Sequence, residues 1–187
     1  ILYIKASPRI DRSYSISVAD VFIDEYLKQN PSDQVKVLDL FNDPLPEFDL
    51  KAANAKYKIM HQKEYTEEDK KAWAQVTNII EEFKSADKYV LAVPMWNFSI
   101  PYKLKQYIDI LVQPSYTFNV TEEGYVGLVD NNPTFISYAR GGEYIQGTES
   151  ERLDHQAKYL EEMLAFIGIT DLRTVITQPT LMNGPDV

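Results

Sequence analysis

The chain has no cysteine and only two histidines, His61 and His155, among its 187 residues. The missing cysteine excludes disulfide bonds, thiolate nucleophiles and cysteine-ligated metal sites, and two isolated histidines argue against a histidine-rich one. No apolar run approaches the roughly 20 residues that cross a bilayer, and no signal peptide is visible. We therefore expect a cytoplasmic protein with no metal site and no membrane partner.

Positive charge is also scarce. Lys and Arg number 19 against 28 Asp and Glu, which gives a net charge of -9. This balance argues against a general nucleic-acid binder, whose surface would be basic. It does not exclude a phosphorylated ligand, because backbone N–H groups and hydroxyls can bind one phosphate without net positive charge.

The length and an ordinary hydrophobic content of 44% indicate one globular domain over residues 1–187. Because Ile1 already lies in an apparent strand and the last residues stop where another helix could begin, we expect further residues at both ends of the natural protein. The segment 41–65 shows no clear periodicity, and segments of this kind are functional lids, interface arms or partly helical.

Short apolar runs alternate with amphipathic helical patterns along the chain, which is typical of an α/β fold. The run from Tyr89 to Val93 is apolar at every position and indicates a strand buried on both faces, as in a parallel sheet. The predicted architecture is an open, parallel, five-stranded sheet with helices on both faces. Its predicted strands span residues 2–5, 35–40, 89–93, 134–139 and 172–177. Residues 113–133 are predicted as a loop, Thr66 as the start of a capped helix, and Leu153 as a residue in phase with the last helix.

The first predicted strand is followed by a loop rich in serine. Ser7, Ser13 and Ser15 precede or open a predicted helix, together with Tyr14. The unpaired N–H groups of a helix N-terminus and serine hydroxyls can form a phosphate cradle. The loop has neither the glycines of a Walker motif nor a Gly-x-Gly-x-x-Gly turn. Serines also cap helices for purely structural reasons, so this signal alone leaves both interpretations open.

The third predicted strand ends in an unusual turn, Pro94-Met95-Trp96-Asn97-Phe98. Surface turns are normally polar and rich in glycine. A turn with Met, Trp and Phe at the carboxyl end of a central strand indicates the wall of a pocket for a flat, partly apolar ligand. The alternative is that these aromatics fold back onto the core.

Arg140-Gly141-Gly142 follows the fourth predicted strand. Paired glycines allow the backbone to approach a planar ligand closely, although this tripeptide is a weak signal by itself. In an open parallel sheet, the loops after the first, third and fourth strands lie at the same edge. A phosphate cradle beside an aromatic turn suggests flavin mononucleotide (FMN) in a flavodoxin-like sheet.

The order of these motifs along the whole chain resembles the FMN-dependent NADH azoreductase/NADH:quinone oxidoreductase family. The resemblance implies a flavodoxin-like fold with strand order 2-1-3-4-5 and a homodimer that holds one FMN per subunit at its interface. The predicted cofactor-binding residues that it implies are Ser7, Ser13, Tyr14, Ser15, Pro94, Met95, Trp96, Asn97, Phe98, Ala139, Arg140, Gly141 and Gly142. The chain departs from the family pattern at Tyr14, where Gln is common, at Trp96, where Tyr is common, and at Ala139, which lacks a serine hydroxyl.

The resemblance implies a two-step oxidoreductase. NADH or NADPH would reduce the flavin and leave, and a quinone or azo compound would then take two electrons. The flavin carries the chemistry, so we expect no hydrolase-like acid–base residue. Phe118 and Phe166 are candidate walls of the substrate site, reaching it across the dimer, and plain packing is an equally good interpretation of both.

Two other functions remain open at this point. An electron-carrier flavodoxin would bind FMN but pass single electrons to protein partners, and its acidity would match this chain. A flavin-free regulatory domain would share only the fold, and a response-regulator-like one would need clustered acids after the first strand, where Ser7-Pro8-Arg9 stands.

Overall fold

A computed structural model describes residues 1–181 and contains one five-stranded parallel sheet. The strands are β1 (Leu2–Lys5), β2 (Lys36–Asp39), β3 (Tyr89–Pro94), β6 (Thr134–Ala139) and β7 (Leu172–Thr177). They lie in the order β2-β1-β3-β6-β7, which confirms the predicted order 2-1-3-4-5. This is a flavodoxin-like doubly wound sheet.

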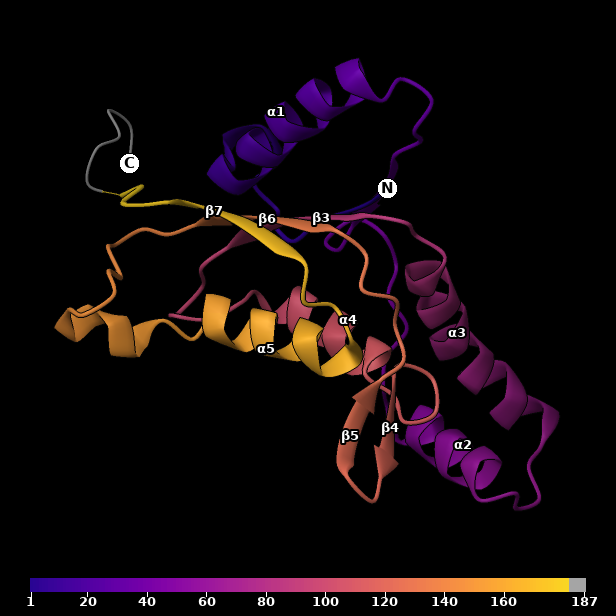
Figure 1. The fold of residues 1–187 in the computed structure, drawn as a ribbon. Coiled ribbons are helices and arrows are strands. Elements are labelled where there is room, and N and C mark those ends of the chain that lie inside the picture. Colours follow the sequence, from indigo (N-terminus) through magenta and orange to yellow (C-terminus); the bar gives the residue numbers. More distant parts are fainter. Residues whose placement is uncertain (182–187) are drawn as a thin grey trace.

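Helices cover both faces of this sheet, as predicted (Figure 1). Helix α1 (Tyr14–Gln29) lies alone on one face, and α4 (Tyr102–Leu111) and α5 (Ala157–Ile167) lie on the other with α3 (Glu67–Lys84). Helix α2 (Leu50–Met60) packs against α3. The predicted irregular segment 41–65 is therefore partly helical, and Asp49 caps its helix by accepting a hydrogen bond from the N–H of Ala52 at 2.9 Å.

The core lies in two layers because the sheet is buried on both sides. The larger cluster lies between the sheet and α3, α4 and α5, and the smaller one lies under α1. In the smaller cluster, Phe22 of α1 stacks on Phe135 of β6 with ring centroids 3.9 Å apart. The fully apolar β3 lies at the centre of the sheet, so its carboxyl end is held rigidly in place.

Two sequence-based expectations were wrong in detail. Residues 113–133, predicted as a loop, contain the antiparallel hairpin of β4 (Phe118–Thr121) and β5 (Gly124–Gly127), which extends away from the sheet in Figure 1. Leu153, predicted in phase with the last helix, instead ends a separate 3-10 helix. Helix α5 begins only at Ala157 because the Asp154 carboxylate accepts hydrogen bonds from the N–H groups of Gln156 and Ala157, both at 3.1 Å.

Across residues 1–181, no helix combines the length and the hydropathy that a bilayer-crossing segment requires. The same residues contain no group of three His, Asp or Glu side chains arranged to hold a metal ion.

Candidate functional site

The loop after β1 forms a pocket of hydroxyl groups at the start of α1. Ser7, Ser13 and Ser15 are all buried, and the Ser13 and Ser15 hydroxyls lie 3.1 Å apart. Ser13 caps α1 by accepting a long hydrogen bond of 3.5 Å from the N–H of Ile16. The first turn of α1 contains no acidic residue, so the positive end of the helix dipole is not neutralised from within.

A small cavity of about 180 Å³ brings this loop together with the two others predicted from the sequence. Its base lies where the carboxyl ends of β1, β3 and β6 meet. The residues that line it are Ser7, Arg9, Arg12, Ser13, Tyr14, Pro94, Met95, Trp96, Ala139, Gly141, Thr180 and Leu181. Eight of the predicted site residues are in this set, and no carboxylate is.

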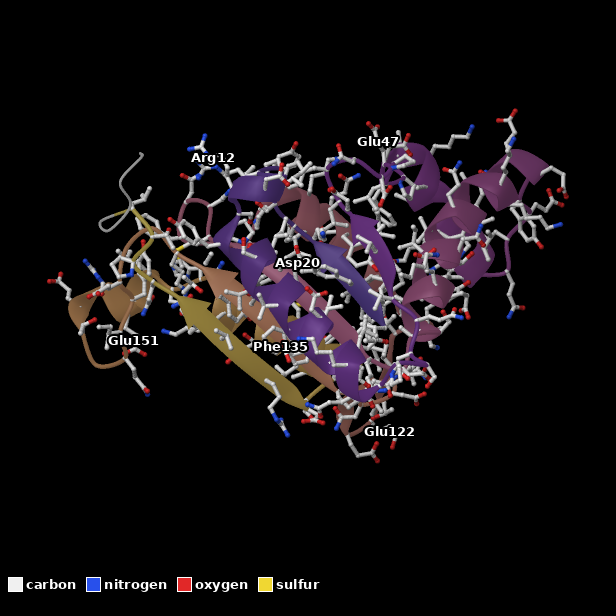
Figure 2. All side chains as sticks on the ribbon, turned by 90° about the horizontal axis from the view of Figure 1, so that it is seen from above. Arg12, Asp20, Glu47, Glu122, Phe135 and Glu151 are labelled. Atoms are coloured by element: carbon white, nitrogen blue, oxygen red, sulfur yellow. The ribbon has the colours of Figure 1, made fainter. Side chains whose placement is uncertain are left out.

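Arg9 and Arg12 give the small cavity its positive charge, and sequence reasoning did not identify them as site residues. Among the described residues, arginine ion pairs involve only Arg140, Arg152 and Arg173, so both guanidinium groups lack a carboxylate partner. Figure 2 shows Arg12 at the rim of the molecule beside the start of α1. Two arginines flanking serines in an otherwise acidic chain are a signal that could have identified them.

The turn after β3 is a tight two-residue hairpin. The Trp96 N–H donates to the Ser99 carbonyl at 2.9 Å, and the Ser99 N–H donates to the Trp96 carbonyl at 3.0 Å. Asn97 and Phe98 therefore both adopt positive φ, +48° and +68°. Asn tolerates this region, whereas Phe rarely adopts it, so the turn is strained in the way that ligand-binding segments often are.

Backbone hydrogen bonds connect this turn to the third loop. The Met95 N–H donates to the Ala139 carbonyl at 2.7 Å, which holds the end of β3 against the end of β6. The next residue, Arg140, has its side chain buried inside the protein rather than in the small cavity. Gly141 borders the small cavity, and Gly142 lies beside Tyr144.

The segment after β7 forms the remaining side of the small cavity. The Thr180 N–H donates to the Arg140 carbonyl at 2.9 Å, and the Leu181 N–H donates to the Gly141 carbonyl at 3.2 Å. A Cβ atom on Gly141 would lie 2.5 Å from Leu181 Cδ1, so the exposed Leu181 side chain would have to move to admit a larger residue there. Thr180 and Leu181 were missed because nothing in their composition indicates that they return to the third loop.

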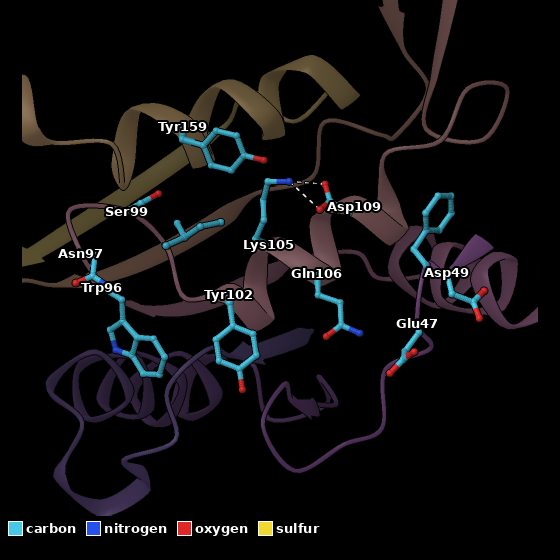
Figure 3. A pocket seen from close by; sticks show the side chains of 12 residues that line it. Glu47, Asp49, Trp96, Asn97, Ser99, Tyr102, Lys105, Gln106, Asp109 and Tyr159 are labelled. Carbon is cyan, nitrogen blue, oxygen red and sulfur yellow. Dashed lines mark hydrogen bonds and ion pairs between the residues drawn. The ribbon is translucent and has the colours of Figure 1, made fainter. Parts of the chain in front are cut away.

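A larger open cleft of about 860 Å³ lies on the other side of Trp96, which lines both spaces (Figure 3). Its floor is the outer face of α4, with Tyr102, Lys105, Gln106 and Asp109, and Tyr159 of α5 and residues 47–49 form its sides. Phe41, Trp96 and Tyr102 form an aromatic cluster at one end, with centroid separations from 5.6 to 6.2 Å. This apolar wall was predicted at Trp96 only.

Two titratable groups in this cleft are perturbed by their surroundings. The hydrogen bond from the Lys105 ammonium to Asp109, at 2.6 Å, raises the pKa of Lys105. Burial raises the pKa of the Tyr159 phenol. Lys105 therefore stays charged and paired and Tyr159 stays neutral at physiological pH, so neither is poised as an acid–base catalyst.

The structure does not place every predicted residue at the small cavity. Ser15 lies behind Ser13, and Asn97 faces the larger cleft. Phe98 contacts Tyr144, with ring centroids 6.1 Å apart. Phe118 and Phe166 line neither space within this chain. They form an aromatic cluster with Tyr125 of the hairpin, at centroid distances of 4.8 and 5.3 Å from Phe166.

Comparison with known proteins agrees with this geometry. Residues 1–186 match the family described as flavodoxin-like fold. The chain is 52% identical over 186 residues to an FMN-dependent NADH:quinone oxidoreductase of Nitratidesulfovibrio vulgaris (strain DP4), with 100% of this chain and 89% of that protein covered. It is 46% identical to another of that name from Desulfotalea psychrophila, with 98% and 87% covered.

Solved structures give the same result. An FMN-dependent NADH-azoreductase from Bacillus anthracis str. Ames Ancestor, in complex with FMN, superposes with a TM-score of 0.89 at 32% identity. The superposition covers 98% of this chain and 89% of that one. Whole-length similarity at this level, over a sheet and site of the same kind, establishes that the chain belongs to the flavodoxin-like family of FMN-dependent NADH:quinone oxidoreductases.

Proposed function

We propose that the protein binds FMN and uses NADH to reduce quinones and azo compounds by two electrons. The observation that carries this proposal is the small cavity: serine hydroxyls and two unpaired arginines gather at a helix N-terminus in a chain of net charge -9. Such a site suits a phosphate monoester. The apolar turn beside it suits the ring system of the same ligand.

The residues present fit FMN. Ser7, Ser13 and the N-terminal N–H groups of α1 would hold the phosphate, and Arg9 and Arg12 would neutralise its charge. Among residues 1–181, no carboxylate lines the small cavity to repel it. The strained turn at Asn97 would present its amide to the polar edge of the ring, and the Gly141-Gly142 backbone would lie close to the ring plane.

When bound, FMN supplies the capacity to accept a hydride and to release two electrons. The chain's own residues then have binding and shielding roles. Met95 and Trp96 would limit water at one side of the ring, and the aromatic cluster of Phe41, Trp96 and Tyr102 would bind planar acceptors. The cleft is open and would admit NADH and the acceptor one after the other. We therefore propose that the oxidised nicotinamide leaves before the acceptor binds.

We also propose that the protein is a homodimer. The hairpin exposes Val120, Tyr125 and Val126, and the cleft over α4 leaves an apolar rim uncovered. Within one chain, the aromatic cluster of Phe118, Tyr125 and Phe166 lies outside both spaces of the site. A second copy would cover these surfaces and bring its cluster to the site, which is the role expected for Phe118 and Phe166.

The test is anaerobic stopped-flow mixing of the FMN-loaded protein with NADH, followed by addition of a quinone or an azo dye. We expect NADH to bleach the flavin band and either acceptor to restore it. Parallel lines in double-reciprocal plots would support a ping-pong mechanism, in which NADH and the acceptor use one site in turn. If NADH does not bleach the bound flavin while dithionite does, the enzyme proposal is wrong.

An electron-carrier function is the second candidate, since the fold and the acidity fit it. The large cleft beside Trp96 favours the enzyme, because a carrier that passes electrons to proteins does not require a cleft for a small acceptor. One-electron intermediates that accumulate during reductive titration, together with no reaction with NADH, would favour the carrier.

A further inference from the structure

The segment Asp154-His155-Gln156, just before α5, contacts two loops of the site. Asp154 Oδ2 accepts a hydrogen bond from Arg140 Nη2 at 2.8 Å, and Gln156 Oε1 accepts one from Arg140 Nε at 2.9 Å. The His155 N–H donates to the Phe98 carbonyl at 3.0 Å. Three consecutive residues thus bond to the loop after β6 and to the turn after β3.

Gln156 is the most direct of these connections. Its side chain is fully buried, and besides accepting from Arg140 it donates from Nε2 to the Val93 carbonyl at 3.0 Å. Val93 directly precedes the turn that begins at Pro94, and Arg140 directly precedes Gly141. One amide therefore sets the spacing between the two loops that would bracket the flavin ring.

Arg140 is enclosed by the same network. Its side chain is 1% exposed, and its guanidinium carbon lies 5.7 Å from the ring centroid of Tyr138 and 5.9 Å from that of Tyr144. Tyr144 in turn makes an edge contact with Phe98. The Arg140 guanidinium is therefore enclosed by the protein, and the predicted contact of Arg140 with the cofactor would have to come from its backbone.

We propose that Asp154, Gln156 and Arg140 are positioning residues that set the distance and orientation of the Met95–Phe98 turn relative to the Gly141-Gly142 backbone. This inference rests on the proposed function, because it assumes that the flavin ring lies between these loops. A buried, charge-paired and hydrogen-bonded network has one well-defined arrangement, which suits this role.

The competing explanation is that the network only anchors α5 to the sheet. In that case its loss would lower stability without altering the surroundings of the bound flavin. The two explanations therefore differ in the properties of the flavin at full saturation, where weaker binding and lower stability no longer contribute.

The experiment compares Gln156→Met with the wild type. Methionine has a similar length but removes the hydrogen bonds to Arg140 and Val93. The matched control is Glu161→Gln, on α5 one turn further along, whose Oε1 accepts from the Tyr138 hydroxyl at 3.3 Å and contacts neither loop. FMN affinity is measured by fluorescence titration of the apoprotein. The midpoint potential and visible spectrum are measured at saturating FMN.

For Gln156→Met we expect the dissociation constant for FMN to rise about tenfold, because the two loops would no longer be held at the spacing that the ring requires. We expect a more negative midpoint potential, because groups that stabilise the reduced ring would be displaced, and an altered visible spectrum. Glu161→Gln should keep all three properties. Asp154→Asn, which keeps the shape and removes the charge, should also weaken FMN binding and alter the visible spectrum, and it is decisive if Gln156→Met does not fold.

If both variants bind FMN with wild-type potential and spectrum, and only their melting temperatures fall, the network is a structural anchor and the inference is wrong. A wild-type protein that does not bind FMN at all would instead overturn the proposed function. Measuring the wild type first separates these two failures.

Discussion

Substitutions of Asn97 can separate the effect of backbone conformation on stability from the effect of its amide on ligand binding. Its φ of +48° is accessible to Asn and Gly but unfavourable for Ala. We expect Asn97→Ala to lower the free energy of unfolding of the apoprotein by about 1 kcal/mol, and Asn97→Gly to change it little. Chemical denaturation of the three apoproteins measures this difference.

The same two variants test whether the Asn97 amide contacts the cofactor. Both remove the amide, so both should weaken FMN binding by a similar factor even though only one strains the turn. A glycine variant that binds FMN as tightly as the wild type would show that the turn matters only for its shape.

Arg9 and Arg12 should distinguish FMN from riboflavin, which lacks the phosphate. We expect Arg12→Ser to weaken FMN binding about five- to tenfold through the loss of one charge-assisted contact and to leave riboflavin binding unchanged. The wild-type preference for FMN should also shrink as salt is raised, because this residue lies at the rim. Equal losses for both ligands would mean that Arg12 supports the loop and does not bind the phosphate.

At the scale of single residues, composition indicated which side chains could bind a ligand better than it indicated where those side chains point. The serines were recognisable because several hydroxyls gather at one helix N-terminus, and Met95-Trp96 because such residues are unusual in a turn after a buried strand. The inward orientation of Arg140 was not, since it depends on Asp154 and Gln156, which lie 14 and 16 residues further along the chain. The position of Thr180 and Leu181 at the small cavity could not be predicted either, because it depends on hydrogen bonds to Arg140 and Gly141, far away in the sequence.

At the scale of elements, the hairpin depends on the close approach of two glycines. A Cβ atom on Gly127 would lie 2.4 Å from the backbone of Gly168, and one on Gly168 would lie 2.4 Å from the Val129 carbonyl oxygen. We expect Gly127→Ala to lower stability by about 2 kcal/mol, the usual scale of overpacking. Thermal melts followed by circular dichroism measure this effect.

Gly124 at the hairpin turn is the matched control. It has a positive φ of +124° but has no atom within 4 Å of an added Cβ, so alanine there meets backbone strain without a clash. Gly124→Ala should therefore be the milder variant. The opposite ranking would show that the hairpin moves freely away from α5.

The contact between α2 and α3 should weaken at acidic pH. The Lys58 ammonium, 2.7 Å away, and the Thr66 N–H lower the pKa of Asp69 from 3.8 to about 2. Because the folded-state pKa is depressed, this stabilisation is fully present above about pH 4. It should be lost as the pH falls toward 2.

Comparison with Asp69→Asn isolates this carboxylate. The stability difference between the wild type and this variant should be constant from pH 5 to 7 and shrink as the pH falls below 4. Urea denaturation across that range measures it. A difference that does not change with pH would mean that the charge of Asp69 does not stabilise this contact.

The sequence predicted the strands and the capped helices because their periodicity and caps are local properties. It did not predict the β4–β5 hairpin. Its strands have four residues each and are largely exposed, so they carry little apolar pattern, and they are held by Gly127 against α5. Contacts between distant segments determine such an element.

At the scale of the whole molecule, the alternation of strands and helices predicted the parallel α/β sheet, and the resemblance over the whole chain supplied the order of its strands. The two-sided burial of β3 fixes it at the centre, and the site then falls at the carboxyl edge by topology. In a single chain, apolar side chains on the hairpin and around the cleft over α4 are exposed to solvent.

Dimer formation is therefore the prediction that belongs to this scale. Val120 on the hairpin is 68% exposed, and Val21 on α1, on the opposite face of the sheet, is 62% exposed. If the hairpin lies in a dimer interface, Val120→Lys places an unpaired charge there and should raise the dimer dissociation constant at least about tenfold. Val21→Lys makes the same chemical change outside that surface and should leave the constant unchanged. Sedimentation velocity across a concentration series measures both, and equal behaviour of the two variants would exclude the hairpin from the interface. Because the cluster of Phe118, Tyr125 and Phe166 would then have no partner site to reach, these aromatics would be packing residues only.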